Sequence, residues 1–443
     1  VAADVVVISI FDLRFNARDD LVFGGDATAW SSFIALGLGG MRPEFALAAI
    51  LLLWVLASLP AFVWLQPPRV KNAHLACGLA AAAGCMLLGA APFDFGPVRR
   101  FAVCSVWELI LRDTHAKRFS PQHAARVEAG ARAMAPNVLT DSPPINPRRP
   151  DIVILVIESW SSYHSRLFGG SRDWTPGLDA AAGRGVALTR CLANGFTTED
   201  GLVAILAGED PLVPPATRAA ILLNNFVGFH GAKRSLPRRL ARSGYRSYFF
   251  TNGPLGFSRL HQFLDSIGFD FLNDGSDSFY RQGPGGSPWP QGCFGASDEA
   301  LYARVRSFFR DNARAVGDGG ERPPKLLVLE TTSSHLPLTC PDGPPHTEER
   351  VMRYADREAA RFIRDIEDDG FFRDGGLLVG LSDHRAMLPI HADEVAAFGP
   401  TATWRIPLFF LADWLPKGPH DGRLASPAAI PPSLEWLTPA TPP

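Results

Sequence analysis

The sequence predicts an α/β protein built on a mostly parallel β-sheet with helices on both faces. A continuous run rich in β-branched residues occupies residues 151–157, and similar apolar runs recur at 247–250, 325–329 and 377–381. Runs without polar alternation are typical of strands buried on both faces of a parallel sheet. Helical spacing lies between them, for example at residues 178–183, 235–243 and 352–368. This alternation of strands and helices predicts a layered α/β domain.

Composition sets limits on the partners of the chain. Its 443 residues are 47% hydrophobic, enough for a large core and more than one domain. The formal net charge is only -2, so we expect no nucleic-acid partner. Six cysteines are too few for a disulfide scaffold. Cys293 and Cys340 would be able to pair if their domain lies outside the cytoplasm.

The N-terminal part of the chain predicts a membrane region over residues 1–96. Residues 45–65 and 75–93 are uncharged apolar runs, each close to the roughly 20 residues that cross a bilayer. Arg69 and Lys71 lie in the short link between them, which favours a cytoplasmic position for the link. The apolar stretches 5–11 and 29–39 leave the number of earlier spans open. We therefore expect a multi-pass protein of the bacterial inner (cytoplasmic) membrane, with its later domain on the periplasmic or extracellular side.

Residues 97–149 are expected to connect the membrane region to a second domain. Residues 101–111 (FAVCSVWELIL) mix apolar side chains with Glu108, a pattern typical of an interfacial helix or a stalk. A proline-rich connector follows at residues 142–150, which indicates a domain boundary. We predict an extracytoplasmic catalytic domain over residues 150–430.

The segment 194–212 (NGFTTEDGLVAILAGEDPL) predicts a helix that begins at a pair of threonines. Apolar residues follow with helical spacing, and acidic residues fill the first turn. We interpret Thr198 as the N-cap, which would place its hydroxyl where free backbone N–H groups favour an anion such as phosphate. A capping threonine usually has only a structural role, so the functional interpretation depends on residues elsewhere in the chain.

Three predicted strands end in residues that can carry chemistry. Glu158 follows the first, His335 lies beyond the third, and Asp383 and His384 follow the last. Because ligands bind at the carboxyl ends of strands in such sheets, we expect these side chains to meet. Carboxylates and imidazole are ligands for Zn²⁺ or Mn²⁺, and the Thr198 hydroxyl would complete a four-ligand site. Separately, each has a structural alternative: a helix cap, a solvated loop pair, or a loop histidine with satisfied hydrogen bonds.

Such a site suits attack on phosphorus. A threonine hydroxyl is a poor nucleophile at neutral pH, and a divalent cation lowers its pKa. The cation would also stabilise charge on the phosphoryl oxygens. We expect one divalent metal ion, Mn²⁺ first, with Zn²⁺ or Mg²⁺ as alternatives. His335 is the candidate that donates a proton to a phosphoryl oxygen or to the leaving group.

Several of these motifs together resemble the lipoteichoic acid synthase and phosphoglycerol transferase branch of the alkaline phosphatase and sulfatase-like superfamily. The resemblance runs from about Pro150 to about Leu411, and the stretches that carry it are Glu158 at its strand end, residues 175–186 (TPGLDAAAGRGV), 198–206 (TEDGLVAIL), 332–337 (TSSHLP), 354–356 (YAD) and 382–387 (SDHRAM). Membrane spans ahead of an extracytoplasmic domain are also similar to that family.

The resemblance implies a role for each matching position. It places the metal ligands at Glu158, Thr198, Asp383 and His384, with Thr198 as the nucleophile and His335 as a catalytic and substrate-binding histidine. Thr197 stands where relatives often have a basic residue, and we include it among the substrate-binding residues. The further substrate contacts do not align cleanly with residues 252–268, where Arg259 or His261 would serve. His391 is either a supporting residue near the substrate or a surface histidine.

The resemblance implies a membrane-anchored transferase that moves phosphoglycerol from phosphatidylglycerol to a glycan or glycolipid acceptor through a phosphothreonine. A phosphoethanolamine transferase, a phosphodiesterase or sulfatase-like hydrolase, and a non-catalytic lipid-sensing protein are the alternatives. Sulfatases proper carry Cys or Ser in a C/S-x-P-x-R motif. The segment 191–195 (CLANG) has neither the proline nor the arginine, which argues against sulfate-ester hydrolysis.

Overall fold

The computed structural model describes residues 149–211, 226–315, 322–415 and 421–438. Within these ranges a nine-stranded sheet has the order β11-β2-β10-β8-β1-β7-β3-β4, with β9 paired to β2. Its strands are β1 (Ile152–Ile157), β2 (Val186–Leu192), β3 (Arg246–Thr251), β4 (Phe271–Asn273), β7 (Lys325–Glu330), β8 (Leu377–Ser382), β9 (Arg405–Ile406), β10 (Leu408–Leu411) and β11 (Asp421–Ala425). A separate hairpin joins β5 (Gln291–Gly292) and β6 (Gly295–Ala296).

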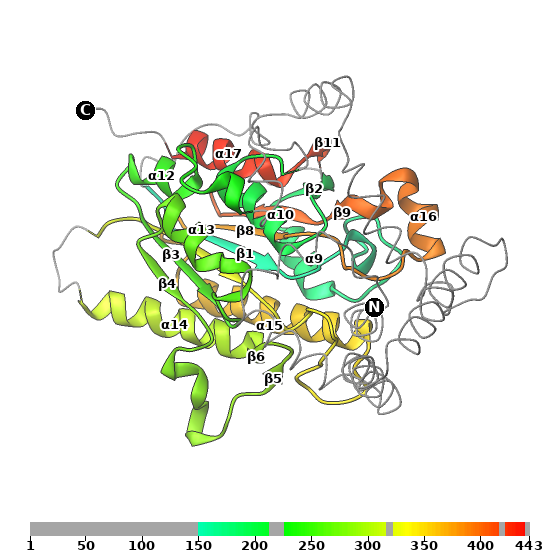
Figure 1. The fold of residues 1–443 in the computed structure, drawn as a ribbon, viewed down its shortest axis with the longest axis horizontal. Coiled ribbons are helices and arrows are strands. Elements are labelled where there is room, and N and C mark those ends of the chain that lie inside the picture. The colour runs from blue at the N-terminus through cyan, green and yellow to red at the C-terminus, as the bar shows by residue number, and fades with distance from the viewer. Residues whose placement is uncertain (1–148, 212–225, 316–321, 416–420, 439–443) are drawn as a thin grey trace, which may run out of the picture. The chain divides into compact units, whose positions relative to one another are not determined.

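Helices cover both faces of this sheet (Figure 1). They are α9 (Pro176–Ala182), α10 (Thr198–Leu202), α12 (Leu236–Ala241), α13 (Leu260–Ile267), α14 (Asp298–Ala315), α15 (Glu348–Asp368), α16 (Ala392–Phe398) and α17 (Ile430–Leu437). Alternate residues of β1 explain the two layers. Ile152, Ile154 and Val156 pack in a core with α12, α13 and α17. Val153, Leu155 and Ile157 pack in another with α9, α14 and α15.

The centre of the sheet is parallel. β1 pairs with β7 on one side and β8 on the other, and β3 continues the parallel set beyond β7. β1, β7 and β8 have six residues each, and every one of these residues is buried, as expected for apolar runs between two helical layers. β10 runs antiparallel to both β8 and β2. The predicted α/β class with a mostly parallel sheet is therefore confirmed.

The predicted membrane spans at 45–65 and 75–93 and the connector at 97–148 lie outside the described residues. Among the described helices, none is both long and apolar enough to cross a bilayer. Cys293 and Cys340, considered above as a disulfide pair, are both free thiols in the described part of the chain.

Candidate metal centre

The carboxyl ends of β1 and β8 bring three potential metal ligands together. Glu158, Asp383 and His384 each offer one ligand atom, and these atoms lie within 4.8 Å of one another. All three side chains are almost completely buried. Because β1 and β8 pair in register up to Ile157 and Ser382, the residues that follow them leave the sheet side by side. The three groups that the sequence expected to meet therefore share one buried cluster.

Thr198 faces the same cluster from α10. Its Oγ1 lies 3.3 Å from Glu158 Oε2 and 3.4 Å from His384 Nε2. Thr198 is the first residue of the helix rather than its N-cap, so that prediction was wrong. The cap is Thr197, whose hydroxyl accepts a hydrogen bond from the Asp200 N–H at 3.3 Å. The capping function falls on Thr197, which leaves the Thr198 hydroxyl available to the cluster.

Gly201 allows α10 to approach the loop after β8. A Cβ on this residue would lie 2.5 Å from the Asp383 carbonyl oxygen and 2.8 Å from its Cα. Real Cβ atoms do not approach backbone this closely, so any other residue would push the helix and the strand end apart. The close contact between Gly201 and Asp383 thus sets the position of Thr198 relative to the acidic ligands.

Hydrogen bonds determine which lone pairs of Asp383 and His384 remain available to a cation. Asp383 Oδ1 accepts from the backbone N–H groups of Ser159 and His384, at 3.1 and 2.8 Å. Asp383 Oδ2 is buried and has no hydrogen-bond partner among the described residues. His384 Nδ1 lies 2.8 Å from the Arg385 carbonyl oxygen, which can only accept. His384 therefore carries its proton on Nδ1 and presents the Nε2 lone pair to the cluster.

The loops that carry these ligands have their own supports. Ser159 lies at φ 58, in the left-handed region, and its hydroxyl donates to Glu158 Oε1 at 2.6 Å. After His384, the buried Arg385 makes a double ion pair with Glu394, at 2.8 and 2.7 Å. A non-glycine residue at positive φ is strained, and such strain is often found at functional sites.

The electrostatics of the cluster match a cation site. Burial and the nearby Glu158 charge raise the pKa of Asp383. Burial by itself would lower the pKa of His384, but the Asp383 and Glu158 charges outweigh it and raise that pKa. Two buried carboxylates, an imidazole lone pair and a hydroxyl form the mixed oxygen and nitrogen donor set of Zn²⁺ or Mn²⁺. Asp383 Oδ2 has no hydrogen-bond partner among the described residues and lies 3.2 Å from His384 Nε2, which supports this fit because a cation between the two atoms would satisfy both.

A cleft opens beside the cluster. Its walls include Glu158, Thr198 and His335, together with two further buried carboxylates, Glu199 and Glu330. Burial and the Asp383 and Glu158 charges raise the pKa of Glu330 well above its usual range. Glu199 Oε1 accepts from the Ser258 hydroxyl at 2.5 Å. The sequence interpretation did not single out these two acids, because an acid at a strand end or in a first helical turn has common structural roles.

His335 lies in the cleft as a neutral imidazole. Burial lowers its pKa to about 4. Its Nδ1 contacts the Leu336 carbonyl oxygen, so Nδ1 is the donor and Nε2 keeps its lone pair. The ring packs edge-on against Phe294 at 4.5 Å between centroids. In this state Nε2 accepts a proton, whereas the sequence interpretation expected a donor.

The other expected substrate residues lie outside this group. Arg259 is not among the residues that line the cleft, although its neighbours Ser258 and Leu260 are. Ser258 and Arg259 both have positive φ, at 48 and 58. His261 Nδ1 lies 3.3 Å from the Leu255 carbonyl oxygen. His391 is 3.6 Å from Glu348, in a separate cluster, and Thr197 serves as the cap described above.

Sequence reasoning missed Asp298, the first residue of α14, which supports the loop that carries His335. Its buried Oδ1 accepts from the backbone N–H groups of Thr332 and Ser333, at 3.2 and 3.1 Å, and from Asn252 Nδ2 at 3.1 Å. An acidic residue in a first helical turn gave only a capping signal in the sequence. Asp298 holds the loop after β7 through hydrogen bonds between segments that are distant in the sequence, so the sequence by itself does not reveal this role.

Fold and site together define an alkaline-phosphatase-like α/β protein with a candidate metal centre at the carboxyl ends of its strands. The family model described as "Sulfatase" matches residues 150–434, which is more than half of the chain. The chain therefore belongs to the sulfatase family. Members of this superfamily are enzymes, among them transferases and sulfatases. Cys191 of the segment compared with the sulfatase motif is completely buried on β2.

Solved structures extend this likeness at the level of the fold. A protein of the alkaline phosphatase superfamily from Vibrio parahaemolyticus is 22% identical with a TM-score of 0.55, covering 72% of this chain and 74% of that one. The lipoteichoic acid synthase LtaP from Listeria monocytogenes is 19% identical with a TM-score of 0.53, covering 71% and 78%.

A third similar structure is an integral membrane protein. The lipooligosaccharide phosphoethanolamine transferase A from Neisseria meningitidis is 14% identical with a TM-score of 0.54, covering 99% of this chain and 83% of that one. None of the curated proteins compared matches this chain. At such identities the similarity establishes the fold and leaves substrate and acceptor to be argued from the site.

Proposed function

We propose that this protein is a membrane-anchored, metal-dependent transferase that moves phosphoglycerol from phosphatidylglycerol to an acceptor hydroxyl on a glycan or glycolipid. One observation carries the proposal: the Thr198 hydroxyl lies within 3.4 Å of both Glu158 and His384, two members of the cluster that also contains Asp383. A hydroxyl held against a candidate metal centre is the arrangement that nucleophilic attack on phosphorus requires.

Glu158, Asp383, His384 and Thr198 would hold the metal ion. When bound, a divalent cation lowers the pKa of a hydroxyl ligand and stabilises charge on phosphoryl oxygens. We favour Mn²⁺, with Zn²⁺ or Mg²⁺ as alternatives. To test this, lipid turnover is measured after the metal has been removed by chelation and Mn²⁺, Zn²⁺ or Mg²⁺ has been added back. Asp383→Asn serves as the control. Activity that survives chelation unchanged would exclude the metal role.

The transfer has two chemical steps. In the first, Thr198 Oγ1 gives up its proton and bonds to phosphorus while the bond to the diacylglycerol oxygen breaks, and that oxygen takes up one proton, so that diacylglycerol leaves as an alcohol. In the second, an acceptor hydroxyl gives up its proton and attacks phosphorus, the bond from phosphorus to Thr198 Oγ1 breaks, and Oγ1 takes up one proton to become a hydroxyl again. The neutral His335, with its Nε2 lone pair, is suited to take the proton of the acceptor hydroxyl.

The direct test is mass spectrometry of the Thr198 peptide after incubation of the full chain with phosphatidylglycerol. A phosphoglyceryl adduct is expected in the native protein and absent in Thr198→Ala. Thr198→Ser keeps a hydroxyl in the same place and should retain the adduct. Full turnover by Thr198→Ala would rule the mechanism out.

A phosphoethanolamine head group is the second candidate, and the acidic lining of the cleft favours it. Glu199 and Glu330 accompany the aromatic rings of Phe257 and Phe294 in the cleft wall. Carboxylates accept hydrogen bonds from glycerol, but they also form ion pairs with an ammonium group, which aromatic faces attract as well. Turnover of phosphatidylethanolamine and phosphatidylglycerol by the native chain and Glu199→Gln separates the donors. A selective loss with phosphatidylethanolamine would favour the ammonium donor.

A membrane location agrees with a lipid donor, because an anchored domain meets its substrate at high local concentration. The uncharged runs at 45–65 and 75–93 motivate this part of the proposal. Protease protection in spheroplasts would locate the catalytic domain. A domain protected from added protease outside the inner membrane would contradict an extracytoplasmic site.

A further inference from the structure

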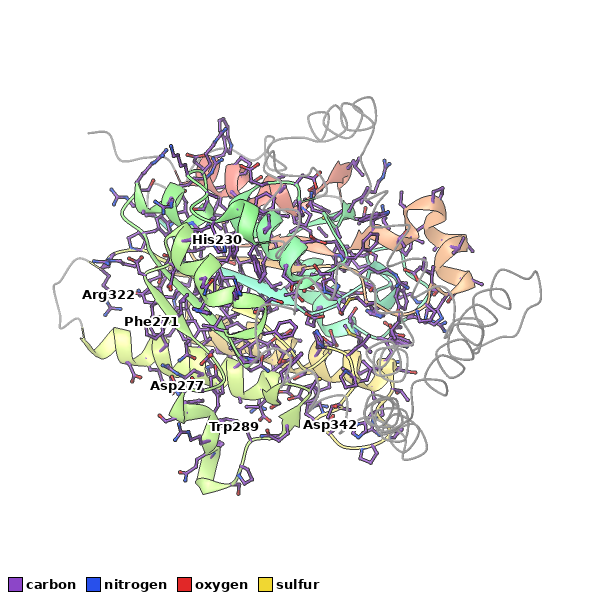
Figure 2. All side chains as sticks on the ribbon, in the orientation of Figure 1. His230, Phe271, Asp277, Trp289, Arg322 and Asp342 are labelled. Carbon is purple, nitrogen blue, oxygen red and sulfur yellow. The ribbon has the colours of Figure 1, made fainter. Side chains whose placement is uncertain are left out.

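Positive charge is concentrated in one segment on the surface of the domain, outside the metal centre. Residues 226–246 (FVGFHGAKRSLPRRLARSGYR) contain one lysine, five arginines and no acidic residue, in a chain whose formal net charge is only -2. His230, labelled in Figure 2, lies near the start of this segment. Because acidic and basic residues nearly balance over the whole chain, this concentration of one sign of charge indicates a local role.

Charge and burial divide α12 into two sides. Leu236 and Leu240 pack in the core, whereas Arg238 and the C-cap Arg242 are exposed and, four residues apart, share one face of the helix. Arg234, also exposed, precedes the N-cap. Like charges at this spacing repel, and a positive charge at a helix N-terminus opposes the helix dipole. The arrangement therefore lowers the stability of the free protein, and an anionic partner would offset that effect.

Acidic residues neutralise only part of this charge. Arg239 forms an ion pair with Glu435 of α17, and Arg246 forms one with Asp270 at 3.2 Å. Glu209 also feels the charges of the segment, although burial raises its pKa. Four exposed basic residues form no ion pair with a carboxylate among the residues that the structure describes: Lys233, Arg234, Arg238 and Arg242.

An exposed tryptophan adjoins these basic residues. α12 and α17 lie side by side (Figure 1), joined by the Arg239–Glu435 pair and by the Ser243 hydroxyl, which donates to the Thr438 carbonyl oxygen at 3.4 Å. Trp436, the residue after Glu435, is 44% exposed. Tryptophan rings prefer the interface between lipid and water, and basic side chains bind anionic headgroups. The combination favours a lipid surface over a nucleic acid.

The place of this surface in the fold also fits a membrane partner. The Tyr245 hydroxyl, just after α12, donates to the Pro150 carbonyl oxygen at 2.8 Å. α12 therefore ends beside the start of the domain, which follows the predicted spans in the sequence. Leu202 and Leu206, beyond Thr198 on the same segment, pack in the same core as α12 and α17. The helical layer that carries the positive charge is thus the layer that carries the candidate nucleophile.

We propose that a basic face, formed by Lys233, Arg234, Arg238, Arg242 and Trp436, docks the domain on a bilayer with anionic lipid headgroups. This inference rests on the membrane location proposed above but not on transfer through Thr198. The attraction acts over about one Debye length, roughly 10 Å at 0.1 M salt, so it requires close contact with the headgroup layer. Docking through this layer holds the catalytic cleft near its lipid donor.

The test is hydrogen exchange, measured by mass spectrometry, of the full chain reconstituted in lipid nanodiscs. One set of discs contains phosphatidylcholine alone, and the other contains about 30% phosphatidylserine, which is anionic but is not a proposed donor. Amides in residues 233–243 and 430–438 should exchange at least about fivefold more slowly in the anionic discs. Salt at about 0.5 M should remove this difference, because it screens the charges.

Two matched triple variants locate the contact. Arg234→Gln, Arg238→Gln and Arg242→Gln together should abolish the slowing. Three exposed arginines of the opposite helical layer, substituted together as Arg310→Gln, Arg364→Gln and Arg373→Gln, remove the same charge and should leave the slowing unchanged. Melting temperatures check that both variants are folded.

Thr198→Ala separates docking from the transfer mechanism. It should lose lipid turnover and keep the slower exchange in anionic discs. Failure of the mechanism would appear as turnover by Thr198→Ala, whereas failure of docking would appear only in the exchange rates.

Three outcomes would overturn the proposal. One is equal exchange of these amides in the two kinds of disc. Another is undiminished slowing in the folded variant that lacks Arg234, Arg238 and Arg242, which would place the lipid contact elsewhere. The third is slowing by a short DNA duplex added to phosphatidylcholine discs without any slowing by phosphatidylserine, which would assign the basic face to a soluble polyanion.

Discussion

Two clusters of histidine and carboxylate contain residues that follow β1 and β8, yet they differ in where their lone pairs lie. In the metal centre, His384 Nδ1 donates to a carbonyl and Nε2 is left for a cation. In the second cluster, His164 Nδ1 accepts from the Ser161 N–H at 3.1 Å, so Nε2 carries the proton and donates to Glu348 at 2.9 Å. His391 lies 3.6 Å from the other Glu348 oxygen.

The difference teaches that residue type does not by itself define a metal site. Both clusters contain ligands that metals prefer, and both histidines are completely buried. Among the described residues, only the first brings three such ligand atoms within 4.8 Å of one another, and its Asp383 Oδ2 accepts no hydrogen bond from the described residues. In the second, hydrogen bonds from the protein already use both nitrogens of His164. We therefore assign catalysis to the first cluster and structural support to the second.

The largest expected effect separates the two clusters by activity. Thr198→Ala or Asp383→Asn should reduce lipid turnover by about 10³-fold or more, because each removes a group at the reacting centre. His391→Ala, in the second cluster, should retain activity within about threefold, since it touches no member of the centre. Initial rates with a defined lipid donor measure both. Comparable losses in the two clusters would contradict this assignment.

A steric change at the metal centre should have the next largest effect. Gly201→Ala places a methyl group against the Asp383 backbone and should destabilise the fold by about 1–3 kcal/mol. Turnover should fall because Thr198 shifts away from Glu158. Gly256→Ala is the matched control, since a Cβ added to Gly256 would meet no atom within 4 Å. Denaturant unfolding and initial rates would be measured on both variants, and equal stabilities would refute the close contact.

The second cluster should respond to pH rather than to metal. Burial raises the pKa of Glu348 from 4.5 to about 7, so the folded state binds a proton that the unfolded state lacks between these values. The carboxyl therefore contributes stability below pH 4.5 that is lost as pH rises through about 7. The glutamine of Glu348→Gln does not ionise, so the variant keeps this stability as pH rises. Its free energy of unfolding, relative to that of the native chain, should therefore increase by up to about 3 kcal/mol over that range.

Denaturant unfolding at several pH values between 4.5 and 8 tests this prediction. The difference between variant and native chain is the quantity to compare, because it cancels the titration of other groups. Burial lowers the pKa of His164 well below its usual range, which gives the opposite slope below pH 6.5 in both proteins. A difference that does not change with pH would show that Glu348 titrates normally.

The smallest expected effect concerns the helix cap. Thr197→Ala removes the hydroxyl that accepts from the Asp200 N–H and should destabilise the protein by about 1 kcal/mol. Turnover should fall only slightly, because Thr197 lies outside the cluster. Thr197→Ser keeps the cap and serves as control. If Thr197→Ala lost activity as strongly as Thr198→Ala, the roles of the two threonines would have to be exchanged.

The sequence by itself predicted the strands, because a short apolar run rich in β-branched residues, such as 151–157, favours a strand buried in a sheet. It also determined that Glu158, Asp383 and His384 follow strands, and parallel pairing then makes their convergence predictable. These inferences use local patterns and one rule of topology. The sequence likewise predicted a helix near Thr198, but it assigned the cap to the wrong threonine by one position.

Only the tertiary structure decided which lone pairs are free and which groups line the cleft. Ser159 donates to a carboxylate 224 positions away, and Glu158 lies 40 positions from the hydroxyl of Thr198. The protonated nitrogen of His384 and the neutral state of His335 both depend on such contacts. Hydrogen-bond satisfaction and burial arise from contacts between distant segments, which periodicity and spacing along one chain do not encode.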